Sequence, residues 1–212
     1  MDRIDLASLR PLDLGFFARD PREVAPELLG CMLVSRAGGV VTGGRIVEVE
    51  AYLGSDDPGS HAATRSITAR NAVMYGPPGS VYVYFAYGNH YMLNLVCLPE
   101  GAAGAVLVRA IEPLIGVEEM TARRGGRAIR EIASGPGKLA SALGVDLTDN
   151  ATTLGDGRLI VYDGPRPREG EIIVTGRVGL SAGHDLDLRY FVRDNAFVSR
   201  GPTGLPATST PS

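Results

Sequence analysis

The sequence predicts an α+β domain with a mostly antiparallel β-sheet. Segments with a hydrophobic period of two dominate residues 31–54 and 81–113, helical patterns occupy residues 114–144, and strand patterns return from residue 158. Strands and helices gathered into separate stretches are typical of α+β folds. A parallel, doubly wound sheet would instead alternate them along the chain.

The predicted domain fills nearly the whole chain of 212 residues. Residues 201–212 are rich in Pro, Ser and Thr and hold little that could pack, so we expect one domain over residues 1–200 and a disordered tail. No run approaches the ~18 apolar residues of a membrane span, and no signal-peptide layout opens the chain. Cys31 and Cys97 are too isolated for a disulfide framework. We therefore expect a cytoplasmic protein without membrane contact.

Helix and loop signals organise the N-terminal part. Asp20 suits an N-cap, Pro21 the first helical position and Glu23 the partner in a capping box, while Gly30 ends the helix. Strands with glycine turns follow. Residues 55–80 are polar and lack a clear period, and connections of this length in compact domains are often functional.

A β-hairpin is predicted over residues 81–98, with its turn at Tyr87–His90. An apolar strand follows over residues 104–113. After the helical region, strand patterns resume at residues 158–164, 171–180 and 189–194.

The charge distribution is uneven. A net charge of −3 argues weakly against a polyanionic partner. Residues 121–130, however, hold four arginines and no acid. Because arginine favours bidentate phosphate contacts, this run is either a phosphate-binding surface or an ordinary solvated face.

The strand RIVEVEAYLG (residues 45–54) carries the first candidate chemistry. Alternation puts Glu48, Glu50 and Tyr52 on one face and apolar residues on the other, with the two carboxylates about 7 Å apart. The polar face is either exposed to solvent, or it holds a carboxylate beside a stacking ring. A carboxylate in that place can take a proton from water.

Further candidates lie on the hairpin and the next strand. Tyr82 and Tyr84 share one face, and Tyr87 lies in the turn, where a large ring adds little to a core. Asn94 and Arg109 interrupt apolar strands, so we expect a hydrogen-bond partner for the amide and a glutamate partner for the guanidinium.

His61, in the long loop, could be a surface residue, a base or a metal ligand. The three histidines of the chain show no short ligand spacing, so a metal is the weakest of these interpretations. We predict no metal site.

Ordered segments of this chain resemble the alkyladenine (3-methyladenine) DNA glycosylases. They are GGRIVEVEAYLG with His61, PPGSVYVYFAYGNHYMLNLV, VLVRAIEP, SGPGKL, RVGLSAG and RYFV, and together they run from about Leu9 to Ser199. The resemblance implies a single domain with a curved antiparallel sheet, peripheral helices and a protruding hairpin. It also implies a base excision repair enzyme that flips an alkylated purine, such as 3-methyladenine, out of double-stranded DNA and releases it by hydrolysis.

The resemblance assigns catalysis to Glu50, as the general base that activates water, and to Arg109, which helps to hold that water. It implies a monomer without a cofactor, associated with the nucleoid through DNA. A glycosylase with lyase activity uses an amine to form a Schiff base, and Lys138 is the single lysine of the chain. We therefore expect no strand cleavage.

Base recognition is assigned by the same resemblance. Tyr52 is one wall of the base stack, with His61 and Tyr84 on the opposite side. Asn94 disfavours guanine through its exocyclic amine. Tyr87 fills the gap that the flipped base leaves in the duplex.

Two other classes stay open from the residues alone. Glu48 and Glu50, about 7 Å apart, match the carboxylate separation of inverting glycosidases, although both would lie on one strand face. A non-catalytic nucleic-acid-binding module could use the same hairpin.

Overall fold

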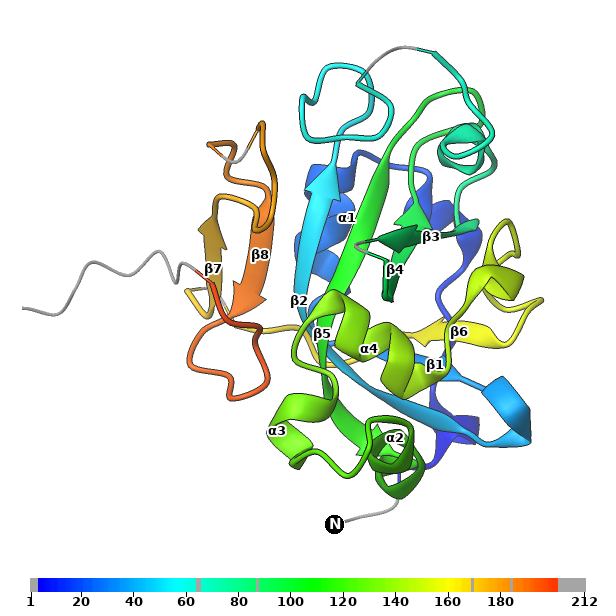
Figure 1. Ribbon diagram of the computed structural model, residues 1–212, viewed down its shortest axis with the longest axis vertical. Coiled ribbons are helices and arrows are strands. Elements are labelled where there is room, and N and C mark those ends of the chain that lie inside the picture. Colours follow the sequence, from blue (N-terminus) through cyan, green and yellow to red (C-terminus); the bar gives the residue numbers. More distant parts are fainter. Residues whose placement is uncertain (1–3, 64–65, 87, 169, 184, 202–212) are drawn as a thin grey trace, which may run out of the picture.

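The computed structural model describes residues 4–63, 66–86, 88–168, 170–183 and 185–201 (Figure 1). Within these residues, eight strands form one sheet with antiparallel pairing, and four α-helices pack around it, which confirms the predicted α+β class. The strands are β1 (Met32–Ser35), β2 (Thr42–Tyr52), β3 (Val81–Ala86), β4 (His90–Val96), β5 (Ala105–Ile115), β6 (Leu159–Tyr162), β7 (Ile172–Thr175) and β8 (Arg189–Val192); the helices are α1 (Pro21–Leu28), α2 (Val117–Arg123), α3 (Ile129–Ile132) and α4 (Pro136–Leu143).

Strand β2 lies at the centre of the sheet. One edge of β2 pairs with β5 along nearly the full length of β2. The strands of the sheet follow the order β3-β4-β5-β2-β1-β6. The other edge of β2 pairs first with β1 and then, over Glu48–Glu50, with β8, so the sheet divides beside β2 (Figure 1). The register between β2 and β5 shifts on both sides of Glu48. Such irregularities re-aim side chains, and here they occur at the two candidate acids.

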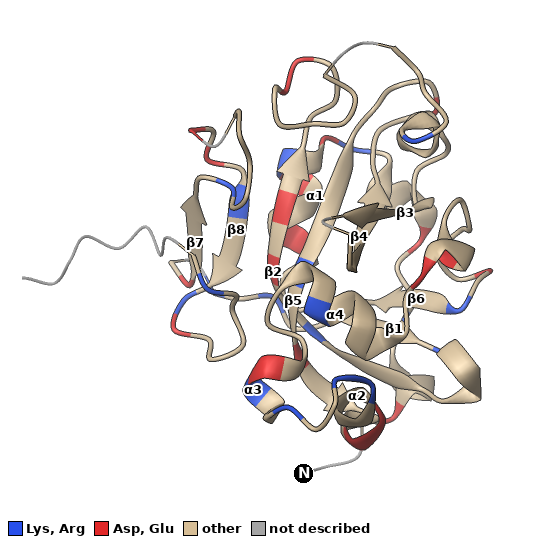
Figure 2. Cartoon of the chain, viewed as in Figure 1, with Lys and Arg blue, Asp and Glu red and all other residues tan. Residues whose placement is uncertain are grey.

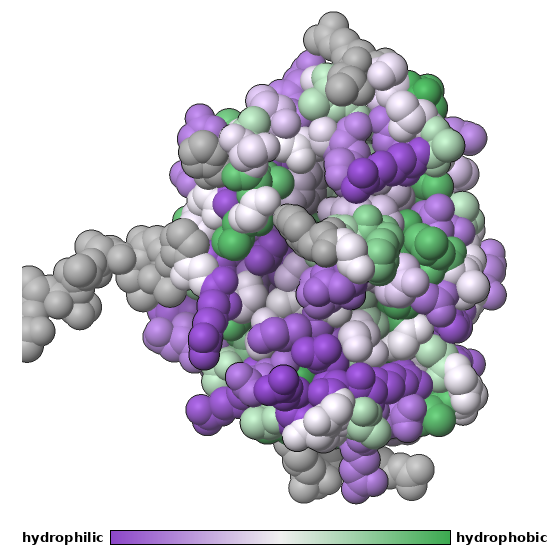
Figure 3. Space-filling model, in the orientation of Figure 1, coloured by the Kyte–Doolittle hydropathy of each residue, from purple (hydrophilic) through white to green (hydrophobic). Residues whose placement is uncertain are grey.

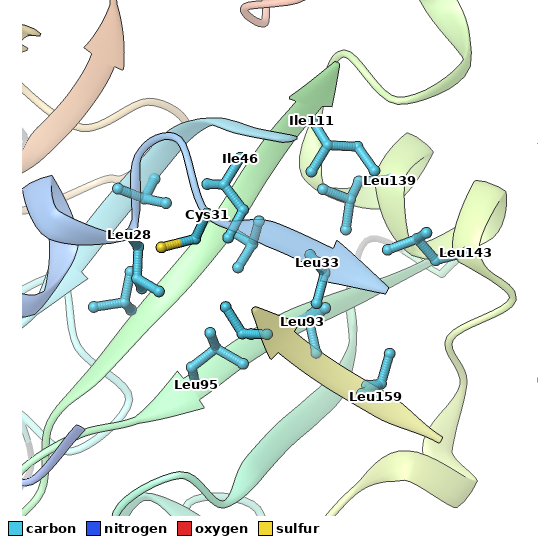
Figure 4. Close-up of a cluster of buried hydrophobic side chains, with 14 of the residues drawn as sticks. Leu28, Cys31, Leu33, Ile46, Leu93, Leu95, Ile111, Leu139, Leu143 and Leu159 are labelled. Carbon is cyan, nitrogen blue, oxygen red and sulfur yellow. The ribbon is translucent and has the colours of Figure 1, made fainter. Parts of the chain in front are cut away.

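The core joins α1, the sheet and α4. Leu28, Ile46 and Leu139 are completely buried in one cluster (Figure 4). In the view of Figure 1, α4 crosses in front of the sheet and α1 lies behind it. A Cβ atom at Gly137 would lie 2.6 Å from His90, so α4 can approach the hairpin this closely only with glycine there.

The first helix begins as predicted. Pro21 is its first residue and Asp20 its N-cap, but the cap accepts the backbone N–H of Arg22 and not that of Glu23. Gly30 follows the helix with a φ of +92°.

The predicted strand over residues 171–180 is wrong in its second half. Strand β7 ends at Thr175, and Gly179 adopts a left-handed φ of +81°. Arg177 and Val178 leave the sheet and donate hydrogen bonds to acidic side chains in and after β2. Long-range bonds, which no local pattern encodes, therefore end this strand.

Two predicted features lie outside the described residues: Tyr87 at the hairpin tip, and residues 202–212 of the expected tail. Both cysteines are buried free thiols. In the part of the chain that the structure describes, no helix is long and apolar enough to cross a membrane.

Candidate active site

A cavity of about 490 Å³ opens between the β3–β4 hairpin, the loop that follows β2 and the loop that follows β7. Glu50 is completely buried directly behind the cavity lining. The lining includes five of the predicted site residues, which come from four separate segments of the chain: Tyr52, His61, Tyr84, Asn94 and Arg109.

The Glu50 carboxylate is held by three donors. The backbone N–H of Val178 donates to Oε1 at 2.8 Å, and Nη1 of Arg109 lies 3.1 Å from the same oxygen. The hydroxyl of Tyr52 donates to Oε2 at 3.0 Å. Of the two alternatives for the polar face of β2, the solvent-exposed one is therefore excluded, and Glu50 is a buried carboxylate beside the Tyr52 ring.

Arg109 has the glutamate partner that its position in an apolar strand requires, and in fact has two. Nε donates to Oε1 of Glu48 at 2.7 Å, while Nη1 faces Glu50. Burial opposes the charge, but the two carboxylates outweigh it and raise the pKa of Arg109 above its ordinary value. The guanidinium is thus a fixed cation at the floor of the cavity.

Tyr52 combines a wall of the cavity with a contact to the acid. Its burial, and secondarily the charge of Glu50, raise the pKa of its hydroxyl, which stays protonated as a donor. The guanidinium carbon of Arg177 lies 4.6 Å from the centre of the ring. One face of the ring is therefore covered from within the protein.

The pair Arg177–Asp57 is a component that the sequence prediction missed. Both side chains are completely buried, and two parallel bonds of 2.5 and 2.6 Å join them. Arg177 also donates to the carbonyl oxygens of Ala51 and Gly183. The requirement that a buried charge has a partner, which predicted a glutamate for Arg109, applies to Arg177 as well. The burial of Arg177 was not predicted, because its position was assigned to a strand over residues 171–180.

His61 is fixed by the tyrosines of β3. Its Nδ1 lies 2.9 Å from the hydroxyl of Tyr82, and its ring packs edge-on against Tyr84 with centroids 4.5 Å apart. Burial, and secondarily the charge of Arg70, lower the pKa of His61. It is therefore neutral near pH 7, and Tyr82 supports its position.

Asn94 has the hydrogen-bond partners expected for a buried amide. Nδ2 donates to the backbone carbonyl oxygens of Tyr82 and Met92 at 3.2 and 3.4 Å. Among the described residues, Oδ1 accepts no hydrogen bond. The amide thus has a fixed orientation in the cavity lining and one acceptor available to a ligand.

The geometry does not support a pair of acids across a sugar. Glu48 is also completely buried, and its oxygens accept hydrogen bonds from Arg109, Arg189 and Ser199. No acidic side chain of the described residues lines the cavity. Within the same residues, no three His, Cys, Asp or Glu side chains gather as possible metal ligands.

Comparisons with known proteins identify relatives of this chain. The family model for methylpurine-DNA glycosylase matches residues 15–196. A protein of Koribacter versatilis is 50% identical over 94% of this chain and 98% of its own length, and one of Methanoculleus marisnigri is 48% identical over 89% and 98%. A third, of Carboxydothermus hydrogenoformans, is 45% identical over 87% and 96%. All three carry the provisional name 3-methyladenine DNA glycosylase. The chain belongs to the methylpurine-DNA glycosylase family.

Proposed function

We propose that this protein is a DNA glycosylase that flips alkylated purines, such as 3-methyladenine, out of double-stranded DNA and hydrolyses their N-glycosidic bond. The observation that carries the proposal is the buried Glu50 carboxylate, held by Arg109, Val178 and Tyr52 behind an aromatic cavity. The family match and the names of the relatives support the same activity.

The flipped base stacks in the cavity, with Tyr52 on one side and His61 and Tyr84 on the other. Base–aromatic stacking is worth roughly 1–3 kcal/mol per base, enough to offset much of the cost of extruding a damaged purine. An alkylated purine such as 3-methyladenine is cationic in DNA, and the faces of tyrosine rings attract cations. Asn94 disfavours the binding of guanine through the exocyclic amine of that base. Tyr87 fills the gap that the flipped base leaves in the duplex.

The hydrolytic water binds at Glu50. Oε1 already faces two donors and Oε2 only one, so Oε2 is the oxygen with capacity for a water, which reaches this completely buried carboxylate once the lining around Tyr52 shifts on DNA binding. Glu50 takes a proton from this water while the water oxygen bonds to C1′ of the deoxyribose. The bond between C1′ and the purine nitrogen breaks, and its electron pair leaves with the base. Arg109 holds the water through its charge and its donors.

The test is a chromatographic assay for free bases released from methylated duplex DNA, with a hypoxanthine duplex alongside to define the substrate range. Release of 3-methyladenine is the expected result. Tight binding of the damaged duplex without any release would favour a non-catalytic binding module.

We expect no strand cleavage to accompany base release. A lyase needs an amine at C1′, and Lys138, the single lysine, lies 3.5 Å from Ser134 and does not line the cavity. Incubation with borohydride should trap no covalent complex with damaged DNA. Any trapped complex would contradict the expectation, and its loss in Lys138→Gln would identify the amine that forms it.

The DNA backbone crosses the surface of α2, α3 and α4. Hydrophilic residues gather over these helices, and Lys and Arg lie among them together with acidic residues (Figures 2 and 3). Within the arginine run, Arg123 is held internally by Glu119 and the carbonyl of Ala37. Arg127 and Arg130 are exposed and are the phosphate contacts that we propose.

The double variant Arg127→Gln/Arg130→Gln should weaken binding to damaged and undamaged duplexes alike. The slope of log K against log salt should become shallower by about one for each lost phosphate contact. Fluorescence anisotropy at several salt concentrations measures both quantities. Arg22→Gln is the matched control, because it removes an exposed arginine from α1, behind the sheet. If the slope of log K against log salt were the same in the double variant and in Arg22→Gln, the surface of α2, α3 and α4 would not be the one that contacts the DNA phosphates.

A further inference from the structure

Glu48 accepts four hydrogen bonds from three residues, although it does not line the cavity. Its Oε1 accepts hydrogen bonds from Nε of Arg109 at 2.7 Å, from Nε of Arg189 at 2.8 Å and from Oγ of Ser199 at 2.8 Å. Its Oε2 accepts the backbone N–H of Ser199 at 2.6 Å. These partners come from β5, β8 and the segment after β8, so Glu48 ties three parts of the fold together.

These contacts determine the orientation of Arg109. A guanidinium is planar, so fixing several of its nitrogens fixes the whole group. Nε is held by Glu48 and Nη2 lies 3.3 Å from Oγ of Ser199, which leaves Nη1 directed at Glu50. Neither Glu48 nor Ser199 lines the cavity, and both act on it only through Arg109.

The cluster also balances charge. Two carboxylates, Glu48 and Glu50, face two guanidiniums, Arg109 and Arg189. Arg189 is the cross-strand neighbour of Glu50 in the pairing of β2 with β8, yet its Nε bonds to Glu48. Without Glu48, both arginines would compete for Glu50, and the acceptor site that we assign to water would be lost.

We propose that Glu48 is a positioning residue, an inference that rests on the proposed glycosylase function. Glu48 holds Nε of Arg109 directly and Ser199 holds Nη2, so that Nη1 stays on Glu50 and Glu50 keeps its orientation toward the water. Removing Glu48 slows base release and leaves the affinity for damaged DNA unchanged, because Glu48 does not line the cavity and contacts its lining through Arg109. A displacement of about 1 Å in a catalytic constellation can cost about 10²-fold in rate, and we expect a loss of that order.

The test compares Glu48→Gln with the charge-balanced double variant Glu48→Gln/Arg189→Gln. Single-turnover base release, affinity for the damaged duplex and the thermal midpoint are measured for each. In Glu48→Gln, the rate should fall about 10²-fold with affinity within about threefold of the wild type. In the double variant, the thermal midpoint should recover while the rate stays low, because Arg109 still lacks its anchor. A folded variant of either kind that releases base at the wild-type rate would overturn the proposal.

A second measurement does not depend on activity. In arginine-¹⁵N-labelled protein, the Nε–Hε resonance of Arg109, assigned by its loss in Arg109→Gln, reports the hydrogen bond to Glu48. It should move or broaden in both Glu48 variants, and an unchanged resonance would overturn the anchoring role. If the wild type releases no base, the proposed function fails, while this resonance still tests whether Glu48 positions Arg109.

Discussion

The variant Glu50→Gln should bind damaged duplex DNA with nearly wild-type affinity and lose base release by about 10²–10⁴-fold, the range typical of a general base. Glutamine has the shape of glutamate: its single oxygen can still accept the hydrogen bond from Val178, and its NH2 group can donate to the Tyr52 hydroxyl once that hydroxyl rotates, so the floor of the cavity should keep its form. It cannot take a proton from water. Single-turnover release from methylated duplex and fluorescence anisotropy measure the two effects separately.

Glu100→Gln is the matched control, because it makes the same chemical change at an exposed position in the turn after β4. It should leave both quantities unchanged. Release by Glu50→Gln within about threefold of the wild type would mean that water is not activated by this carboxylate, whose expected contribution is far larger. Loss of binding together with release would show that Glu50 supports the cavity and not the chemical step.

Much of this site could be predicted because buried polar groups must be satisfied. Arg109 and Asn94 each interrupt an apolar strand, and the cost of burying an unpaired charge or amide already required partners for both. The structure supplies these partners. The hairpin and its shared tyrosine face could likewise be predicted, since a period of two is a local property of the sequence.

The remaining features depend on contacts between distant segments. Asp57 and Arg177 are 120 positions apart, and the apolar run before Arg177 resembles the start of a longer strand. The register shifts between β2 and β5 at Glu48 do not interrupt the alternation of apolar and polar residues along the β2 sequence. Periodicity alone therefore left open that both acids face solvent. Tyr82 could be predicted as a packed aromatic, but its contact with His61 requires the fold of the long loop.

Asp57→Ala should destabilise the fold by about 3–5 kcal/mol, the usual cost of leaving one member of a buried ion pair without its partner. Both side chains are completely inaccessible, so water cannot solvate the remaining Arg177 charge. For a chain of this length, the loss corresponds to a fall in Tm on the order of 10 °C. Differential scanning calorimetry measures it, and Asp156→Ala, in an exposed turn, is the matched control.

The double variant Asp57→Ala/Arg177→Met separates the charge from the packing. It removes the stranded cation, so it should recover part of the lost stability. The recovery should be incomplete, because the carbonyl oxygens of Ala51 and Gly183 lose their donor.

The contribution of this ion pair to stability should also depend on pH. Although burial opposes the charged form of Asp57, the hydrogen bond from Arg177 lowers the pKa of Asp57 in the folded protein. The stabilisation is therefore fully present above the unfolded-state pKa of about 3.9 and is lost as the pH falls through the lower, folded-state pKa. The stability difference between the wild type and the double variant should narrow in that acidic range, and a difference independent of pH would show that the pair stabilises the fold by packing alone.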